Sequence, residues 1–289
     1  MTTALVSTRK GLFTLTVEGG RFELSAPAFP GVQVINAVGD PRDGTLYASL
    51  GHGHFGAHVH RSDDRGATWV EVAAPEYPPK PEGLVEINQM TQQEIRWATE
   101  LIWIIEPGHP DEPGVIWAGT VPGGLFRSTN RGDTWEIVDA FWNLPNRPLW
   151  FGGGFGDPGI HSIVIDPREA GHLSVAISSG GVWRTSDGGI TWEPRTVGMH
   201  SGYVPEEIAE HPDNQDPHRV VRPLADPDVL WCQHHEGIWR STDNGDHWHK
   251  IEQAGPSTFG FAVAVHPQQP DTAWFVPAVS DMDRVPVEA

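Results

Sequence analysis

One nine-residue motif occurs four times in this 289-residue chain, and it constrains the fold more than any other feature. Each copy begins with Arg and continues as Ser/Thr-x-Asp/Asn-x-Gly-x-Thr/His-Trp. The final tryptophans are 66, 57 and 56 residues apart (69 to 135, 135 to 192 and 192 to 248). A repeat of this length indicates a chain built from copies of one structural unit. The copies span residues 61–69, 127–135, 184–192 and 240–248.

Each shared position of the motif has a structural role. The Asp or Asn side chain can accept hydrogen bonds from nearby backbone N–H groups and close a tight turn. The glycine two residues later supplies a positive φ, and the tryptophan begins the next strand, where its ring can wedge between sheets. We therefore expect structural rather than catalytic roles for this set: Asp64, Gly66, Trp69, Asn130, Gly132, Trp135, Asp187, Gly189, Trp192, Asp243, Gly245 and Trp248.

Short apolar strands precede every copy of the motif. Residues 124–126 and 181–183 lie directly before two of the copies, and residues 115–119 and 173–177 precede these in turn. With one further apolar strand, each unit contains four short antiparallel strands, and the motif forms the turn between the third and the fourth. Four-stranded units at this period are typical of propeller blades. The sequence thus predicts an all-β fold, a six- or seven-bladed β-propeller.

The repeat resembles the Asp-box, or bacterial neuraminidase repeat (BNR), of sialidases, sortilin-type receptors and photosystem assembly factors. The resemblance extends over roughly residues 36–280, through four copies in phase. It implies a propeller of the sialidase-like, WD40/YVTN/BNR-like class. It does not imply one activity, because such relatives differ in function.

The strands expected near the N-terminus and those expected near the C-terminus do not combine into one complete four-stranded blade. We expect one propeller domain over residues 1–289 and interpret the chain as a C-terminally truncated piece of a larger ring. The alternative is an open ring closed by oligomerisation. The expected blades are a partial one at 3–28, full ones at 33–73, 98–139, 160–195 and 219–252, and an incomplete one at 260–289.

The net charge and the cysteine content bear on the partners of the chain and on its disulfides. The formal net charge of −19 disfavours nucleic acid and anionic membrane surfaces as partners. The single cysteine, Cys232, lies in an apolar run and allows no intramolecular disulfide, so we expect a buried thiol. No signal peptide or membrane-spanning run is evident, and a cytoplasmic location is the default expectation.

Ligands of propellers bind on the face formed by the connections between blades and by the loops between the second and third strands. Three connections are long, at about residues 73–97, 139–160 and 195–220. We therefore expect a carbohydrate, peptide or protein ligand there. The histidines that reach this face could hold a divalent metal, or could instead hydrogen-bond around a polar channel; they are His52, His54, His58, His60, His234 and His235.

Aromatic and charged residues also converge on this face. Trp150, in the glycine-rich stretch 150–161, could serve as a platform for a sugar ring or a peptide, or could simply pack the loop. Candidate catalytic carboxylates, which glycoside hydrolysis needs in pairs, are Glu86, Glu106, Asp157 and Asp281. Candidate binding residues are Arg9, Arg96, Trp150, His161, Tyr203, Glu236 and Arg284.

The chemistry of sialidases does not map onto this chain. The resemblance would imply three arginines, an Asp acid/base and a Tyr nucleophile, with the first arginine in an Arg-Ile-Pro motif near the N-terminus. The nearest match, residues 284–286, is at the other end, and only Tyr203 of three tyrosines lies in a suitable connection. We expect a ligand- or protein-binding propeller without classical sialidase activity. The alternative is a sialidase-related glycoside hydrolase acting on an unidentified glycan, assisted by metal if the histidines bind one.

Overall fold

The computed structural model describes residues 2–53, 56–152 and 156–287. The described residues form strands β1 to β21 and a few short helices, so the all-β prediction is confirmed. The strands make four four-stranded sheets, one three-stranded sheet and one two-stranded sheet, and all the pairings between them are antiparallel. The chain divides into two compact units: unit 1 comprises residues 1–80 and 97–137, and unit 2 comprises residues 81–96 and 138–289.

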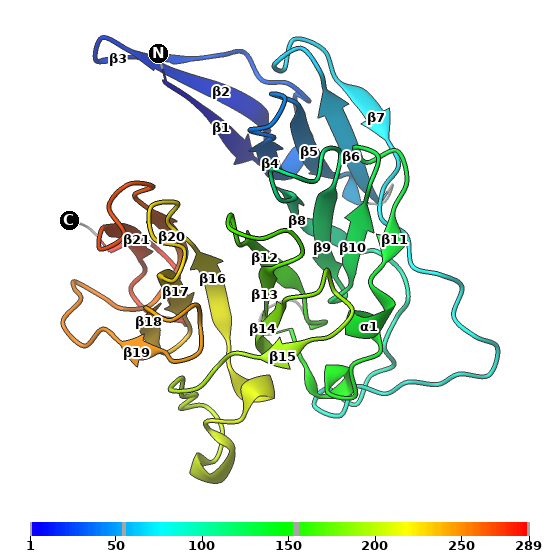
Figure 1. The fold of residues 1–289 in the computed structure, drawn as a ribbon, viewed down its shortest axis with the longest axis vertical. Helices are drawn as coiled ribbons and strands as arrows, with labels where there is room; N and C mark the ends of the chain where they lie inside the picture. The colour runs from blue at the N-terminus through cyan, green and yellow to red at the C-terminus, as the bar shows by residue number, and fades with distance from the viewer. Residues whose placement is uncertain (1, 54–55, 153–155, 288–289) are drawn as a thin grey trace. The chain divides into compact units, whose positions relative to one another are not determined.

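Unit 1 contains three of the sheets (Figure 1). The three-stranded sheet is β1 (Thr2–Thr8), β2 (Gly11–Glu18) and β3 (Arg21–Leu24). The next is β4 (Gln33–Gly39), β5 (Leu46–Gly51), β6 (Ala57–Ser62) and β7 (Val70–Val72). The last is β8 (Leu101–Pro107), β9 (Ile116–Val121), β10 (Leu125–Ser128) and β11 (Glu136–Ile137).

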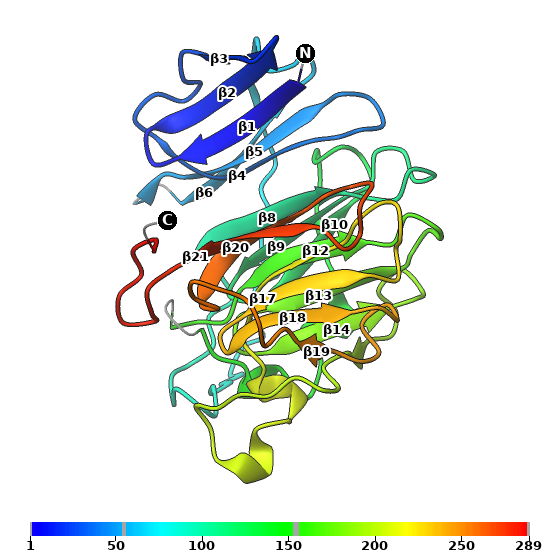
Figure 2. The same cartoon turned by 90° about the vertical axis from the view of Figure 1, so that its left-hand side faces the viewer.

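Unit 2 contains the other three sheets, and Figure 2 shows β17, β18 and β19 side by side. Helix α1 (Asp139–Trp142) and the 3₁₀ turns η2 (Arg147–Leu149), η3 (Glu206–Ile208) and η4 (Pro212–Asn214) lie in the connections. The first sheet is β12 (Ile160–Ile165), β13 (Leu173–Ile177), β14 (Gly181–Thr185) and β15 (Glu193–Pro194). The others are β16 (Pro217–Val221), β17 (Leu230–His234), β18 (Gly237–Ser241) and β19 (His249–Lys250), then β20 (Gly260–Val265) and β21 (Ala273–Pro277).

The first strands of successive sheets pack against each other within each unit. Strand β4 lies against β8 in unit 1, and β16 lies against both β12 and β20 in unit 2. Second strands such as β9 and β13 are buried along their whole length, which explains their continuous apolar sequences. This blade-by-blade packing is the arrangement of a β-propeller.

The four motif copies form four closely similar turns. In the first, the Ser62 hydroxyl accepts a hydrogen bond from the Gly66 N–H (2.7 Å), and the Asp64 carboxylate accepts one from the Thr68 N–H (2.8 Å). Gly66 has a φ of +90°, which only glycine adopts readily. The other three copies repeat both hydrogen bonds. Hydrogen bonds from Thr68 lower the pKa of Asp64 to about 2, so this carboxylate is a turn-closing acceptor rather than a proton donor.

Two of the motif tryptophans reach back to the preceding sheet. The Trp135 indole N–H donates to the carbonyl oxygen of Ala73, just after β7, and that of Trp248 donates to Arg195, just after β15 (both 2.9 Å). These contacts connect successive sheets within a unit, as the expected wedge position requires. Cys232 is also fully buried, and burial raises the pKa of its thiol.

The described residues hold fewer blades than the predicted six- or seven-bladed propeller. The described residues form five sheets of three or four strands and one pair, β20–β21, rather than six or seven four-stranded blades. None of the helices in these residues is long and apolar enough to span a membrane.

Candidate functional site

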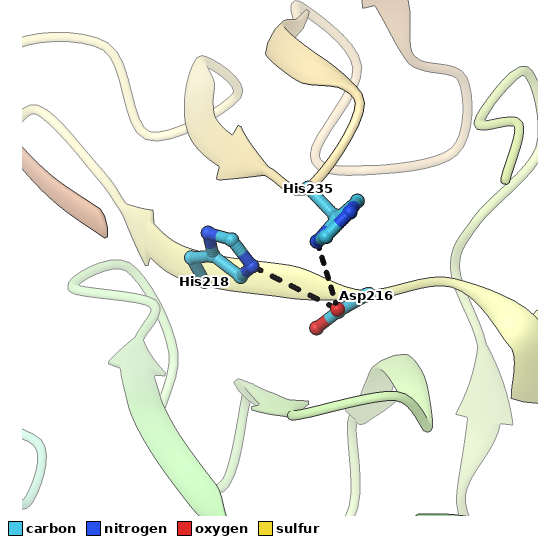
Figure 3. Close-up of side chains that lie close together, drawn as sticks. All are labelled: Asp216, His218 and His235. Atoms are coloured by element: carbon cyan, nitrogen blue, oxygen red, sulfur yellow. Dashed lines mark ion pairs between the residues drawn. The ribbon is translucent and has the colours of Figure 1, made fainter. Parts of the chain in front are cut away.

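Three side chains of unit 2 converge where β16 begins: Asp216, His218 and His235 (Figure 3). The ladder between β16 and β17 has a bulge, because Pro217 pairs with His234 and Arg219 pairs with Gln233, which leaves His218 as an extra residue. One step beyond the ladder, the His235 N–H donates to the Asp216 carbonyl (2.9 Å). Register therefore places His235, in the β17–β18 turn, beside Asp216. We call these three residues the Asp216 cluster.

The ligand atoms of the Asp216 cluster lie close together. The Oδ2 atom of Asp216 is 3.5 Å from Nδ1 of His235 and 3.7 Å from Nε2 of His218. The Asp216 side chain is 9% exposed, that of His218 10% and that of His235 24%. Burial alone would raise the pKa of Asp216, but the neighbouring histidines hold it below its ordinary value, so the carboxylate is ionised at neutral pH.

The rings around the cluster fix its geometry. Nδ1 of His218 is 2.6 Å from the carbonyl oxygen of Gly260, and its ring stacks on Phe261 (centroids 4.6 Å, planes 15° apart). The His235 ring meets Tyr203 and Phe259 edge-on, at 5.5 Å each. Phe259 also packs edge-on against Phe261 (5.4 Å), so aromatic rings surround the two imidazoles.

Three of the predicted binding residues lie around this cluster. Tyr203 is 39% exposed, and its hydroxyl donates to the Asn214 carbonyl. The Glu236 carboxylate accepts a hydrogen bond from the Gly202 N–H (3.2 Å). Arg284 lies over the Phe261 ring (5.2 Å) and pairs with Asp281 (2.6 Å).

His234 is not a metal ligand, which corrects one prediction. It is fully buried, and its two ring nitrogens lie 3.0 Å and 3.1 Å from the backbone nitrogens of Asp216 and Glu236. Burial lowers its pKa to about 3, so the ring is neutral. His234 thus supports the backbone of the Asp216 cluster and offers no free nitrogen to an ion.

His52, His58 and His60 of unit 1 make contacts of their own among the described residues. The rings of His52 and His58 pack edge-on (4.7 Å), and Nδ1 of His58 is 2.6 Å from Oε1 of Glu71. His60 packs against Phe29 (4.9 Å), and burial lowers its pKa. His54 lies outside the described residues. Among the described residues, these histidines do not bring three ligand atoms together.

Trp150 and His161 are core residues, so the predicted exposed platform is wrong. Trp150 is 0% exposed, and its indole N–H donates to the Asp213 carboxylate (2.8 Å). His161 is 3% exposed, its Nδ1 lies 2.9 Å from the Ser162 hydroxyl, and burial lowers its pKa to about 3. In the described part of this long connection, Phe141, Trp142 and Trp150 are all buried, as the packing alternative proposed.

Three candidate catalytic carboxylates of unit 2 pair with three different arginines. Glu86 binds the buried Arg147, which stacks on Trp142 (3.9 Å). The other two pairs are Asp157 with Arg96 (2.8 Å) and Asp281 with Arg284 (2.6 Å). In unit 1, Glu106 lies on β8 opposite Trp117, and Arg9 is exposed in the β1–β2 turn. Within unit 2 these pairings favour structural roles for Glu86, Asp157 and Asp281.

The sequence prediction identified His235 but missed Asp216 and His218. A signal was present, because Asp216 and His218 are two residues apart at the start of a strand, and alternate strand positions share a face. The adjacent histidines His234 and His235 led to a predicted metal site in the β17–β18 turn instead. The bulge at His218 has no clear sequence signature.

Several characterised proteins resemble parts of this chain, although no family model matches it. A probable oligoxyloglucan-reducing end-specific xyloglucanase from Neosartorya fischeri is 32% identical over 133 residues, which cover 46% of this chain and 13% of that protein. A xyloglucanase from Hypocrea jecorina is 28% identical over 154 residues, 50% of this chain and 17% of that protein. The chain thus spans less than a fifth of the length of these relatives.

Solved structures show the same fold at lower identity. The GH74 enzyme of Niastella koreensis superposes with a TM-score of 0.62 at 19% identity, covering 94% of this chain and 38% of that one. The GH74 xyloglucanase of Xanthomonas campestris superposes with a TM-score of 0.61 at 18% identity, covering 95% of this chain and 41% of that one. YCF48 bound to the D1 peptide superposes with a TM-score of 0.51 at 13% identity, covering 95% of this chain and 72% of that one. The chain therefore has the fold of these proteins, and its sequence is similar to segments of xyloglucanases.

Proposed function

We propose that this chain is part of a carbohydrate-active β-propeller whose ligand is xyloglucan or a related branched β-glucan. The observation that carries the proposal is the 28–32% identity to xyloglucanases over about half of the chain. The sequence alone favours a non-catalytic binding propeller, and these relatives support the glycoside hydrolase alternative more strongly.

The residues around the Asp216 cluster suit a carbohydrate ligand. The Tyr203 ring is part-exposed and can stack on the apolar face of a sugar. Glu236 and Arg284 border the same region and supply an acceptor and donors for sugar hydroxyls. An aromatic surface with a few fixed polar groups is typical of a site for small organic ligands.

A hollow elsewhere in unit 2 offers a competing location. It has a volume of about 600 Å³, and its lining includes Trp239, Trp248, His200, His247 and Lys250. Both tryptophans are almost completely buried, so they present little stacking surface. We therefore favour the region of Tyr203 and use His200 as the comparison residue.

A peptide ligand is the second candidate, because YCF48, which has the same fold, is described with a bound peptide. Its identity of 13% supports the fold alone. The similarity to xyloglucanases covers local sequence as well as fold, which is why we favour the glycan.

Xyloglucan binding and hydrolysis are tested on the purified chain. In native gels containing xyloglucan, hydroxyethyl cellulose or mannan, we expect xyloglucan to retard the wild-type protein. Tyr203→Ala should abolish the retardation, whereas Phe22→Ala, which truncates a 74% exposed aromatic on β3, should not. New reducing ends released from xyloglucan would establish hydrolysis. Equal mobility in all three gels would overturn the proposal.

We also propose that the chain belongs to a larger propeller of six or seven blades of the Asp-box type. Its incomplete sheets support this, because β3 exposes Phe22 and Leu24 and β21 exposes Trp274 and Val276. Further strands would cover such side chains. A reading frame that extends beyond residue 289 would support this interpretation, and a stop codon there would favour closure by oligomerisation.

A further inference from the structure

The tautomer of His218 leaves its Nε2 atom without a proton, opposite the Asp216 carboxylate. Nδ1 of His218 is 2.6 Å from the Gly260 carbonyl oxygen, which can only accept, so Nδ1 carries a proton. In the neutral ring, Nε2 then has a lone pair, and it faces Oδ2 of Asp216 at 3.7 Å. In that neutral state two electron-rich atoms face each other, and either a metal ion between them or a proton on Nε2 would stabilise the arrangement.

The two distances from the Asp216 carboxylate fit a metal ion better than direct hydrogen bonds. Nitrogen and oxygen atoms in good hydrogen bonds are about 2.7–3.2 Å apart. The two separations from Asp216 are 3.5 Å and 3.7 Å. Ligands placed about 2.1 Å from a tetrahedral zinc ion are about 3.4 Å apart. The observed separations are therefore close to the edge length of a metal coordination shell.

The ligand side chains are held in place by further contacts. The Gly260 carbonyl orients His218 in the manner typical of metal-binding histidines, whose second ring nitrogen donates to a carbonyl or carboxylate. Phe261 stacks on the same ring. Asp216 is fixed through its backbone N–H to His234 (3.0 Å) and through Oδ1, which accepts a long hydrogen bond from the Ser179 N–H (3.4 Å).

We propose that Asp216, His218 and His235 bind a divalent first-row transition-metal ion through one carboxylate oxygen and two imidazole nitrogens. This donor set suits zinc, iron, nickel or copper rather than magnesium or calcium, which prefer oxygen alone. Three protein ligands leave at least one position for water or a ligand hydroxyl, as in catalytic rather than structural sites. The part-exposed His235 marks the side from which an ion enters. The inference does not rest on xyloglucan binding.

The competing explanation for the short distance between His218 and Asp216 is a proton on Nε2 of His218. A doubly protonated His218 would pair with Asp216 without metal, and the cluster would then be a buried ion pair. Nitrogen-15 NMR of the histidine rings separates the two explanations, because Nε2 of His218 carries a proton in the ion pair and none in the metal complex.

Zinc titration of the chelator-treated protein, followed by calorimetry, tests the site. We expect about one equivalent in the wild-type protein and at least a ~100-fold weaker affinity in His235→Ala and His218→Ala. His200→Ala, a part-exposed histidine of the same unit, and His52→Ala should bind zinc like the wild type. Cobalt(II) absorption of the wild-type protein should show a low-symmetry site with nitrogen and oxygen ligands.

Two results would overturn the inference. One is wild-type protein that binds neither zinc nor cobalt. The other is zinc binding of wild-type affinity in His235→Ala, a turn residue whose loss should leave the fold intact. If His218→Ala does not fold, zinc-edge X-ray absorption of the wild-type protein decides, because it must show two imidazoles in the shell.

Discussion

His218 and Phe261 occupy corresponding bulge positions at the starts of β16 and β20, and their rings stack at 4.6 Å. The same position in β12 is His161, which is buried and whose Nδ1 lies 2.9 Å from the Ser162 hydroxyl. One repeated backbone irregularity thus serves packing in one sheet and brings a ligand side chain into the Asp216 cluster in the next.

Removing the Phe261 ring should weaken metal binding without removing a ligand. We expect Phe261→Ala to bind zinc about 10-fold more weakly, because the His218 ring loses the surface that orients it. The NMR line of the His218 ring should broaden or shift, which a purely structural defect elsewhere would not cause. Phe22→Ala is the matched control, and an unchanged affinity in Phe261→Ala would show that stacking does not position the ligand.

The motif tryptophan Trp192 should be important for stability. Its ring is 9% exposed and packs edge-on against Phe141 at 4.7 Å. We expect Trp192→Ala to lower the free energy of unfolding by about 3–5 kcal/mol in urea denaturation. Ile190→Ala, in the same turn but 73% exposed, should change it by less than about 0.5 kcal/mol. Equal stability of the two variants would contradict the role of this ring in the packing of unit 2.

Acid should destabilise the protein through the turn carboxylates. Hydrogen bonds from Thr191 lower the pKa of Asp187 to about 2 in the folded state, below its ordinary value of 3.8. A lowered folded-state pKa stabilises the fold above the unfolded pKa, and this stabilisation is lost as the pH falls from about 4 to about 2. Asp187→Asn should reduce the fall of the unfolding midpoint in this range.

Asparagine is a fair replacement in that experiment, because Asn130 already fills the same position in another copy and accepts from the Thr134 N–H (2.9 Å). An undiminished pH dependence in Asp187→Asn would assign the acid sensitivity to other carboxylates.

Glu86 should be structural rather than catalytic. Its partner Arg147 is 6% exposed and stacks on Trp142. Glu86→Gln removes the negative charge that pairs with this buried guanidinium and should lower the free energy of unfolding by about 3–5 kcal/mol. The double variant Glu86→Leu with Arg147→Met should recover most of this loss. A Glu86→Gln protein of wild-type stability would return Glu86 to the list of catalytic candidates.

The repeated turns could be predicted from sequence because each of their residues has one local role. Gly66 supplies a positive φ and Asp64 accepts hydrogen bonds from residues within four positions, so nothing distant decides the outcome. The site depended on distant contacts. The buried Trp150 donates a hydrogen bond to Asp213, 63 residues later, and the His218 ring is oriented by the carbonyl of Gly260, 42 residues later. Such contacts follow from register and loop packing, which residue patterns do not specify.

The cytoplasmic location and the single-domain organisation stay predictions from the sequence. The expectation that nucleic acids and membranes are not partners also stays a prediction; it rests on the net charge of −19.

Calorimetric titration of a xyloglucan oligosaccharide into the purified chain tests the central claim most directly. We predict saturable binding by the wild-type and His200→Ala proteins, and its loss in Tyr203→Ala, which would place the ligand beside the Asp216 cluster. Absence of binding by the wild-type protein, or equal binding by Tyr203→Ala, would contradict the account.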